Sequence, residues 1–130
     1  MINEIIEILI VEDNIIIQQV IEICLISLGY SVCGIVATGE AALDFIREKK
    51  PDAVLMDITL DGHPYGIDAA IAIKKLHQVP IVFLTSSAKA EDLERAKKIP
   101  ADGFIGKPFR DVDIHSALKS AIPVHNDTTR

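Results

Sequence analysis

Five short apolar runs along this chain alternate with segments of helical periodicity, and each run has the length of a buried strand. The runs are Ile5–Val11, Ser31–Ala37, Ala53–Met56, Pro80–Leu84 and Gly103–Gly106. Strands that are almost continuously apolar are typical of a parallel sheet covered by helices on both faces. The alternation therefore predicts an α/β fold built on one doubly wound, five-stranded parallel sheet.

Five helices are expected between and after these strands. They are expected over residues 14–28, 38–49, 66–77, 89–98 and 111–121. Asn14, Thr38 and Asp111 are expected to open three of them, because such side chains accept hydrogen bonds from the first turn of a helix. The inner stripe of the first helix is expected to comprise Ile17, Val20, Ile21, Cys24, Leu25 and Leu28.

The order of the strands follows from how such elements connect. Right-handed crossovers leave few topologies for this alternation. The flavodoxin-like order 2-1-3-4-5 is expected, and it places the first and third strands side by side at the switch point of the sheet. The domain is expected to span residues 1–122, followed by a polar tail at 123–130.

Composition excludes several kinds of protein. At 130 residues, of which 49% are hydrophobic, the chain is one domain with a sizeable core. A net charge of −6 argues against a general nucleic-acid surface. No apolar run approaches the roughly 20 residues that cross a bilayer, and no signal-peptide pattern opens the chain, so we expect a cytoplasmic protein that contacts no membrane. Cys24 and Cys33 have no metal-binding spacing and are expected to be buried small side chains.

Polar residues stand at the carboxyl ends of four of the five runs. Glu12 and Asp13 follow the first run, Asp57 the third, Thr85 the fourth and Lys107 the fifth. Taken one at a time, each has an ordinary explanation, such as an acidic helix start, a turn or a solvated lysine. Because the carboxyl ends of parallel strands meet at one edge of a sheet, the residues together predict a single binding site there.

The residue types at this edge favour phosphoryl chemistry. Three carboxylates in one crevice repel one another unless a proton or a cation intervenes. Oxygen ligands favour a hard cation, and a small site that keeps several waters suits Mg²⁺. An aspartate can act as a nucleophile toward phosphorus. The oxygens of a transferred phosphoryl group need fixed partners, and Lys107 and Thr85 are suited to that role.

Four motifs at these positions resemble those of the receiver domain of two-component response regulators. The motifs are Ile8–Asp13, Leu55–Ile58, Phe83–Ser86 and Gly106–Phe109, and the resemblance covers about residues 5 to 122. It implies a signalling domain of a phosphorelay rather than a turnover enzyme. Such a domain accepts a phosphoryl group from a histidine kinase or a histidine phosphotransfer domain and slowly hydrolyses it.

The resemblance also implies roles for the acidic residues. Asp57 is implied as the phosphoacceptor. Mg²⁺ is implied to bind Asp13, Asp57 and the backbone carbonyl of Thr59, while Glu12 assists the metal through water. These assignments make the acidic edge of the sheet the input of a switch.

The remaining assignments concern how the phosphoryl group is sensed. Thr85 and Lys107 are implied to contact it, and the bond from Lys107 to Pro108 is implied to be cis. Movement of Thr85 toward the phosphate would let Phe104, the switch aromatic, rotate inward. The readout surface would then be the fourth helix, the fifth strand and the fifth helix. Dimerisation linked to phosphorylation through the fourth and fifth helices is one assembly that this allows, and no direct nucleic-acid binding is expected of the domain.

The sequence departs from the family pattern after the acceptor. Asp61 stands where the family often has proline, in a loop about one residue longer than usual, and is expected to add negative charge near the metal. Thr59 and Ser87 occupy positions that tune access of the hydrolytic water in this family. The apolar residues Ile15 and Ile16 exceed what the inner stripe of the first helix needs, and we hypothesise that they help dock the phosphodonor domain.

Other functions fit the sequence less well. A pseudo-receiver that acts only as an interaction module is disfavoured because the site residues are chemically intact. A phosphatase of the aspartyl-phosphate class needs a second Asp two residues after the nucleophile, where this chain has Thr59. A flavodoxin-like cofactor binder or a nucleotide binder needs a phosphate-binding loop that no motif here supplies.

Overall fold

The computed structural model describes residues 5–85, 89–99, 101–106 and 108–123. Its elements in chain order are β1 (Glu7–Val11), α1 (Ile15–Ser27), β2 (Ser31–Val36), α2 (Gly39–Glu48), β3 (Ala53–Asp57), α3 (Tyr65–Leu76), β4 (Ile81–Thr85), α4 (Ala90–Lys97), β5 (Gly103–Gly106) and α5 (Asp111–Ala121). The five strands form one parallel sheet in the order β2-β1-β3-β4-β5. The predicted flavodoxin-like α/β topology, with five strands and five helices, is therefore confirmed.

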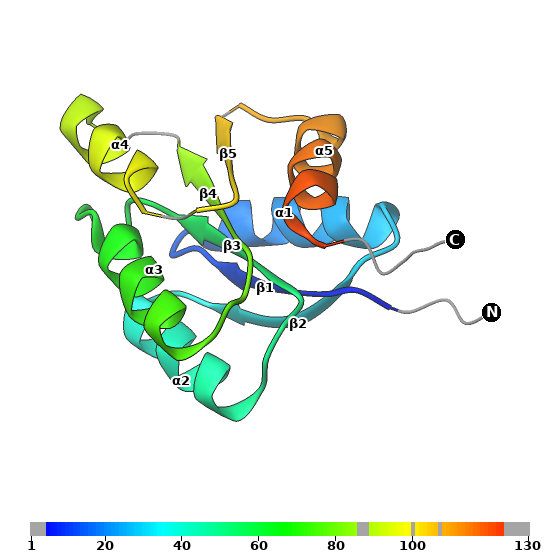
Figure 1. Cartoon of the computed structure of the whole chain (residues 1–130). Coiled ribbons are helices and arrows are strands. Elements are labelled where there is room, and N and C mark those ends of the chain that lie inside the picture. Colours follow the sequence, from blue (N-terminus) through cyan, green and yellow to red (C-terminus); the bar gives the residue numbers. More distant parts are fainter. Residues whose placement is uncertain (1–4, 86–88, 100, 107, 124–130) are drawn as a thin grey trace.

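Helices cover both faces of the sheet (Figure 1). α1 and α5 lie on one face, and α2, α3 and α4 lie on the other. Successive side chains of a strand point to opposite faces. Accordingly, Ile8 and Ile10 of β1 belong to the core beneath α1 and α5, whereas Leu9 and Val11 belong to the core beneath α2, α3 and α4. Because both faces of the sheet are covered, its central strands β1, β3 and β4 are apolar up to the functional edge, apart from the partly buried Glu7 at the start of β1.

Two of the predicted helix starts are confirmed. The Asn14 side chain accepts a hydrogen bond from the backbone N–H of Ile17 at 3.0 Å, and α1 follows. The Thr38 hydroxyl likewise accepts from the N–H of Ala41 at 3.0 Å before α2. Both side chains satisfy a backbone donor that has no partner within its helix.

The prediction that Asp111 caps the last helix is wrong. Arg110 occupies the cap position, and its backbone N–H donates to the Asp113 carboxylate at 2.8 Å. The Asp111 carboxylate instead accepts from the Cys24 thiol at 2.9 Å, which joins α5 to α1. Burial, followed by this hydrogen bond and the charge of Asp111, raises the pKa of the Cys24 thiol to about 12. Cys24 is therefore a buried structural thiol, as predicted, whereas Cys33 is only partly buried.

The inner stripe of α1 is narrower than predicted. Ile21, Cys24 and Leu25 are buried, but Val20 is 50% exposed. Successive residues of an α-helix lie about 100° apart around its axis. Once Ile21 faces the sheet, Val20 therefore falls toward the outer side, where other aliphatic residues of this helix also lie.

A glycine fixes where α3 begins. The backbone N–H of Gly66 donates to the carbonyl of Ile58 at 3.0 Å, and a Cβ atom at this position would collide with the backbone carbonyl of Asp57. Only glycine permits such a close approach of two backbones. The start of α3 is thereby held against the end of β3, beside Asp57.

The predicted tail at 123–130 lies almost wholly outside the described residues, and the predicted domain boundary stays a prediction. Among the described ranges, no helix has both the length and the apolar composition needed to cross a membrane.

Candidate functional site

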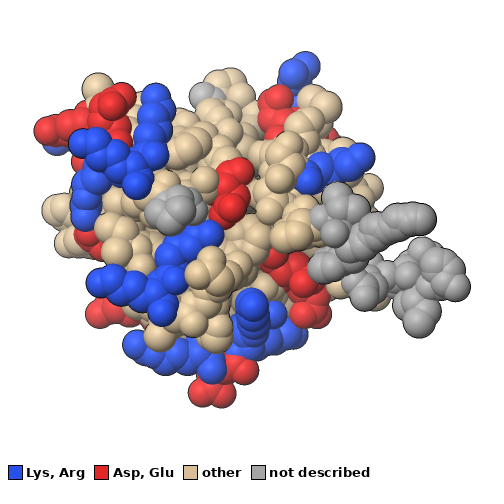
Figure 2. Space-filling model, viewed as in Figure 1, with Lys and Arg blue, Asp and Glu red and all other residues tan. Residues whose placement is uncertain are grey.

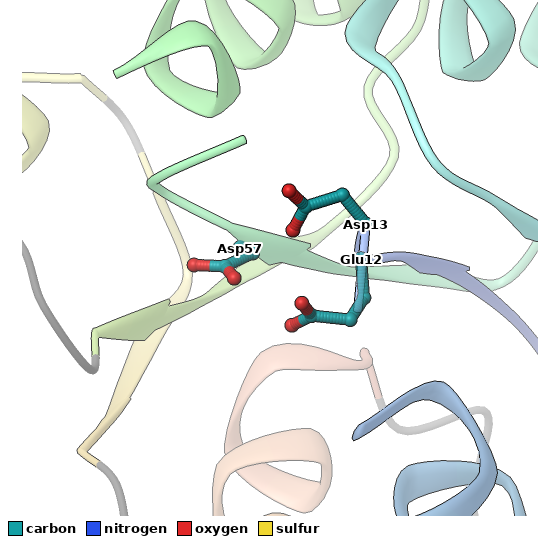
Figure 3. A group of neighbouring side chains, drawn as sticks. All are labelled: Glu12, Asp13 and Asp57. Atoms are coloured by element: carbon teal, nitrogen blue, oxygen red, sulfur yellow. The ribbon is translucent and has the colours of Figure 1, made fainter. Parts of the chain in front are cut away.

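Three carboxylates meet at the carboxyl edge of the sheet, where β1 and β3 end side by side (Figure 3). Glu12 and Asp13 directly follow β1, and Asp57 is the last residue of β3. Because Val11 pairs with Met56 in the parallel ladder, the residues that follow them emerge next to each other. One carboxylate oxygen from each of the three residues lies within 4.8 Å of the other two.

Glu12 is anchored in the backbone around the end of β1. Its side chain is buried, with the residue only 1% exposed, and its Oε2 accepts from the backbone N–H of Asn14 at 3.1 Å. Its own N–H donates to the carbonyl of Val36 at 3.0 Å, and its carbonyl accepts from the Gln18 side-chain amide. These contacts hold the buried carboxylate in one orientation, facing the end of β3.

The other two carboxylates are held by the loop between β3 and α3. Asp57 is 4% exposed, and its Oδ1 accepts from the backbone N–H of Thr59 at 3.1 Å. Asp13 is exposed, and its Oδ2 accepts from the backbone N–H of Asp61 at 2.9 Å. The same loop therefore orients one oxygen of each aspartate.

This cluster suits a hard divalent cation. Its ligand atoms are all carboxylate oxygens, two from buried residues and one from an exposed residue. A cation such as Mg²⁺ would offset the repulsion between these charges and keep a side open to water. Thr59 lies next to this cluster, because its backbone N–H donates to the Asp57 carboxylate. The metal-binding role of its carbonyl stays a prediction. The residues present therefore fit the ion that the sequence predicts.

Thr85 lies at the next strand end along the sheet. It is the last residue of β4, and its neighbour Leu84 pairs with Asp57 of β3. The Thr85 hydroxyl donates to the carbonyl of Ile105 on β5 at 3.3 Å. In the described structure this side chain therefore ties the ends of β4 and β5 together.

Phe104, the predicted switch residue, is partly exposed. It is 39% exposed, and its ring lies 5.7 Å from the ring of Phe83, measured between centroids. The ring is therefore not enclosed in the core. The predictions for Lys107, for its bond to Pro108 and for Ser87 concern positions outside the described residues.

One contact at the site was missed by the sequence reasoning, which considered only the charge of Asp61. Asp61 and Gly62 have φ angles of 54° and 73°, and the flanking Leu60 and His63 exchange backbone hydrogen bonds of 2.8 and 3.1 Å. An Asp–Gly pair is favoured where both central residues of a tight turn need positive φ. This turn presents the Asp61 N–H to Asp13. Among the described residues, the Asp61 carboxylate is not part of the metal-ligand cluster.

Comparisons with known proteins agree with this geometry. The family model for the response regulator receiver domain matches residues 8–119. The transcriptional regulatory protein PdtaR of Mycobacterium tuberculosis is 32% identical over 122 residues, which are 94% of this chain and 59% of that protein. The chain thus spans little more than half the length of this curated relative.

Two solved structures are similar over nearly the whole chain. The signal receiver domain of a modulated diguanylate cyclase from Desulfovibrio desulfuricans has a TM-score of 0.85 and 34% identity, covering 92% of this chain and 94% of that one. The receiver domain of the sensor histidine kinase PA1611 from Pseudomonas aeruginosa has a TM-score of 0.77 and 33% identity, covering 91% of this chain and 98% of that one. That structure has a magnesium ion coordinated in its active-site cleft.

Proposed function

Because this chain belongs to the response regulator receiver domain family, we propose that it is a phosphoryl-accepting signalling switch with Asp57 as the acceptor. The observation that carries the proposal is the convergence of Glu12, Asp13 and Asp57 at one strand edge. Asp57 is buried and oriented by a backbone N–H, so its carboxylate is held in place for reaction.

Asp57 is the nucleophile of the proposed reaction. One of its carboxylate oxygens attacks the phosphorus of a phosphohistidine, and an acyl phosphate forms on Asp57. The P–N bond breaks, and its electron pair goes to the imidazole nitrogen of the donor. Asp13, Asp57 and the Thr59 carbonyl would hold Mg²⁺, with Glu12 assisting through water, and the bound ion would supply positive charge that offsets the charge on the phosphoryl oxygens. Water later hydrolyses the acyl phosphate, which releases inorganic phosphate and restores the Asp57 carboxylate.

Two further residues sense the modification in this proposal. The Thr85 hydroxyl leaves the Ile105 carbonyl and donates to a phosphoryl oxygen, while the Lys107 ammonium contacts another. The movement of Thr85 vacates space that Phe104, now partly exposed, turns inward to fill. The surface of α4, β5 and α5 then changes and carries the signal, through a partner or through a phosphorylation-linked homodimer.

Receiver domains of response regulators interact with histidine kinases, and the donor proposed here is a histidine kinase or a histidine phosphotransfer domain. Ile15 and Ile16 are 67% and 71% exposed at the start of α1, which follows the acidic pair after one residue, Asn14. Apolar side chains at this end of the helix offer the donor a contact that excludes water from the reaction.

Incubation with Mg²⁺ and acetyl phosphate tests the proposal, with intact mass as the measurement. The wild-type protein is expected to gain one phosphoryl group, and Asp57→Ala is expected to gain none. Asp44→Ala, which makes the same substitution at an exposed carboxylate on α2, is the matched control and should be modified like the wild type. Absence of modification in the wild type would reject the proposal and favour a pseudo-receiver that acts without phosphorylation.

A further inference from the structure

A groove between α3 and α4 is lined entirely by basic and aliphatic residues. Its volume is about 430 Å³, and its lining residues are Ile71, Lys74, Lys75, Arg95, Lys98 and Ile99. Figure 2 shows Lys and Arg side chains over α3 and α4, with Asp and Glu side chains beside them over α4. The lining of the groove itself includes basic residues and no acidic residue, although the chain as a whole has a net charge of −6.

The basic residues of the groove fall into two pairs. Lys74 is engaged internally, because its Nζ lies 2.9 Å from both the Asp102 carboxylate and the Val79 carbonyl. Arg95 is likewise paired with Asp68 on α3. Lys75 and Lys98 are exposed, and neither forms an ion pair with any acidic residue in the described part of the chain. Their charges are therefore available to a ligand that enters the groove.

The floor of the groove is aliphatic. Ile71 and Ile99 are half-buried and pack against the core beneath α2, α3 and α4. A ligand that fits must present apolar groups to these side chains and negative groups to the lysines. The lining contains no aromatic residue on which a nucleic-acid base could stack, so single-stranded nucleic acid suits the groove less well.

We propose that this groove docks an acidic amphipathic segment of a partner protein. Apolar side chains of the segment pack on Ile71 and Ile99, and its carboxylates pair with Lys75 and Lys98. The lysines supply attraction and orientation, and the isoleucines supply the apolar area that such a contact needs. This binding does not depend on acceptance of a phosphoryl group at Asp57.

Another hollow in the described part of the chain has the opposite character. It has a volume of about 500 Å³ at the starts of α2 and α3, and its lining includes Glu40, Asp61 and Asp68. An acidic segment is repelled there. On this face of the sheet, an acidic segment is therefore expected to bind in the groove between α3 and α4 and not in the hollow at the starts of α2 and α3.

A titration of the isotope-labelled full chain, followed by amide NMR without any phosphoryl donor, tests the proposal. The probe is a synthetic 12-residue peptide, roughly the length of α3, with leucines at helical spacing and glutamates elsewhere. The expected result is a set of amide shifts confined to the groove residues. The affinity of the peptide is expected to fall when the salt concentration rises. A second peptide with every glutamate replaced by glutamine is expected to bind at least about tenfold more weakly.

Charge-reversal variants distinguish binding in the groove from attraction by the overall charge of the protein. Lys75→Glu with Lys98→Glu is expected to weaken binding at least about tenfold. Lys50→Glu with Lys119→Glu changes the net charge equally at exposed positions outside the groove, and should leave the affinity within about twofold of wild type. Lys75→Gln with Lys98→Gln, which adds no negative charge near the helix ends, should show a smaller weakening and guards against misfolding of the first variant.

Four results would overturn the proposal. They are no shifts with the glutamate peptide, equal weakening by both charge-reversal pairs, tighter groove binding of a 12-nucleotide single-stranded DNA, and the same shifts appearing on concentration of the protein alone. Phosphorylation of Asp57 in the separate mass assay is unaffected by any of them, so failure of this proposal and failure of the proposed function are distinguishable.

Discussion

The central strands of the sheet are more completely buried than the segment from α4 to β5. Every residue of β3 is buried, as are four of the five residues of β1. In β5 only Ile105 is buried, and in α4 only Ala96. The carboxylates are therefore attached to a rigid frame, whereas the elements proposed to move are lightly held. Thr85 lies at the border between the two regions, where its hydroxyl reaches from β4 to β5.

The largest expected effect tests the difference in packing directly. Leu55→Ala removes a fully buried side chain from β3 and is expected to cost about 2–5 kcal/mol of unfolding free energy. Leu93→Ala on α4 removes the same atoms from a half-buried position and is expected to cost about 1 kcal/mol. Urea unfolding followed by circular dichroism measures both. Equal costs would contradict the contrast between frame and moving segment.

A metal effect of intermediate size is expected at the rigid edge. Mg²⁺ at tenfold above its dissociation constant is expected to raise the unfolding free energy of the wild-type protein by about 1.4 kcal/mol. Asp57→Asn retains an oxygen that can accept from the Thr59 N–H but removes one of the three charges, so this increment should largely disappear. Thermal or urea unfolding with and without EDTA measures it, and Ca²⁺ in place of Mg²⁺ shows whether the site discriminates by ion size.

A smaller effect is expected at the border residue. Thr85→Val removes the hydrogen bond to the Ile105 carbonyl at nearly constant volume and is expected to cost about 0.5–1 kcal/mol. In the wild type, beryllofluoride with Mg²⁺ is expected to shift the ring resonances of Phe104, and Thr85→Val should abolish that shift. Thr85→Ser retains the hydroxyl and should preserve it. A wild-type shift that persists in Thr85→Val would place the switch elsewhere.

The central strands and the positions of the carboxylates at their ends were largely predictable from the sequence, because one simple rule governs them. A strand covered on both faces must be apolar, and polar residues become possible again only where it ends. That rule places Asp57 and the pair Glu12 and Asp13 at one edge, since parallel strands end on the same side. No knowledge of loop conformation is needed for this step.

The contacts that depend on loops and on helix placement were not predictable in the same way. The bond from the Asp61 N–H to Asp13 requires a turn with two positive φ angles, which residue charge does not reveal. The bond between Asp111 and Cys24 joins residues 87 positions apart, so no local pattern encodes it. Val20 satisfies the helical period yet lies outside, because the period does not fix the width of the buried stripe.

The smallest effect on stability is expected on the outer side of α1. This helix packs on the central strands with its inner side, but its outer side is exposed. Ile15→Ser with Ile16→Ser should change the unfolding free energy by no more than about 0.5 kcal/mol, because neither side chain is packed in the core. The same variant is expected to slow phosphotransfer from a donor histidine domain about tenfold, since its contact area is lost, while modification by acetyl phosphate stays unchanged. Ile5→Ser with Leu76→Ser removes exposed aliphatic residues at the opposite edge of the sheet and should slow neither reaction. Equal slowing of both reactions in the α1 variant would instead mean that these isoleucines maintain the acceptor site itself. The start of α1 would then count as part of the rigid region that holds the acceptor, together with the central strands.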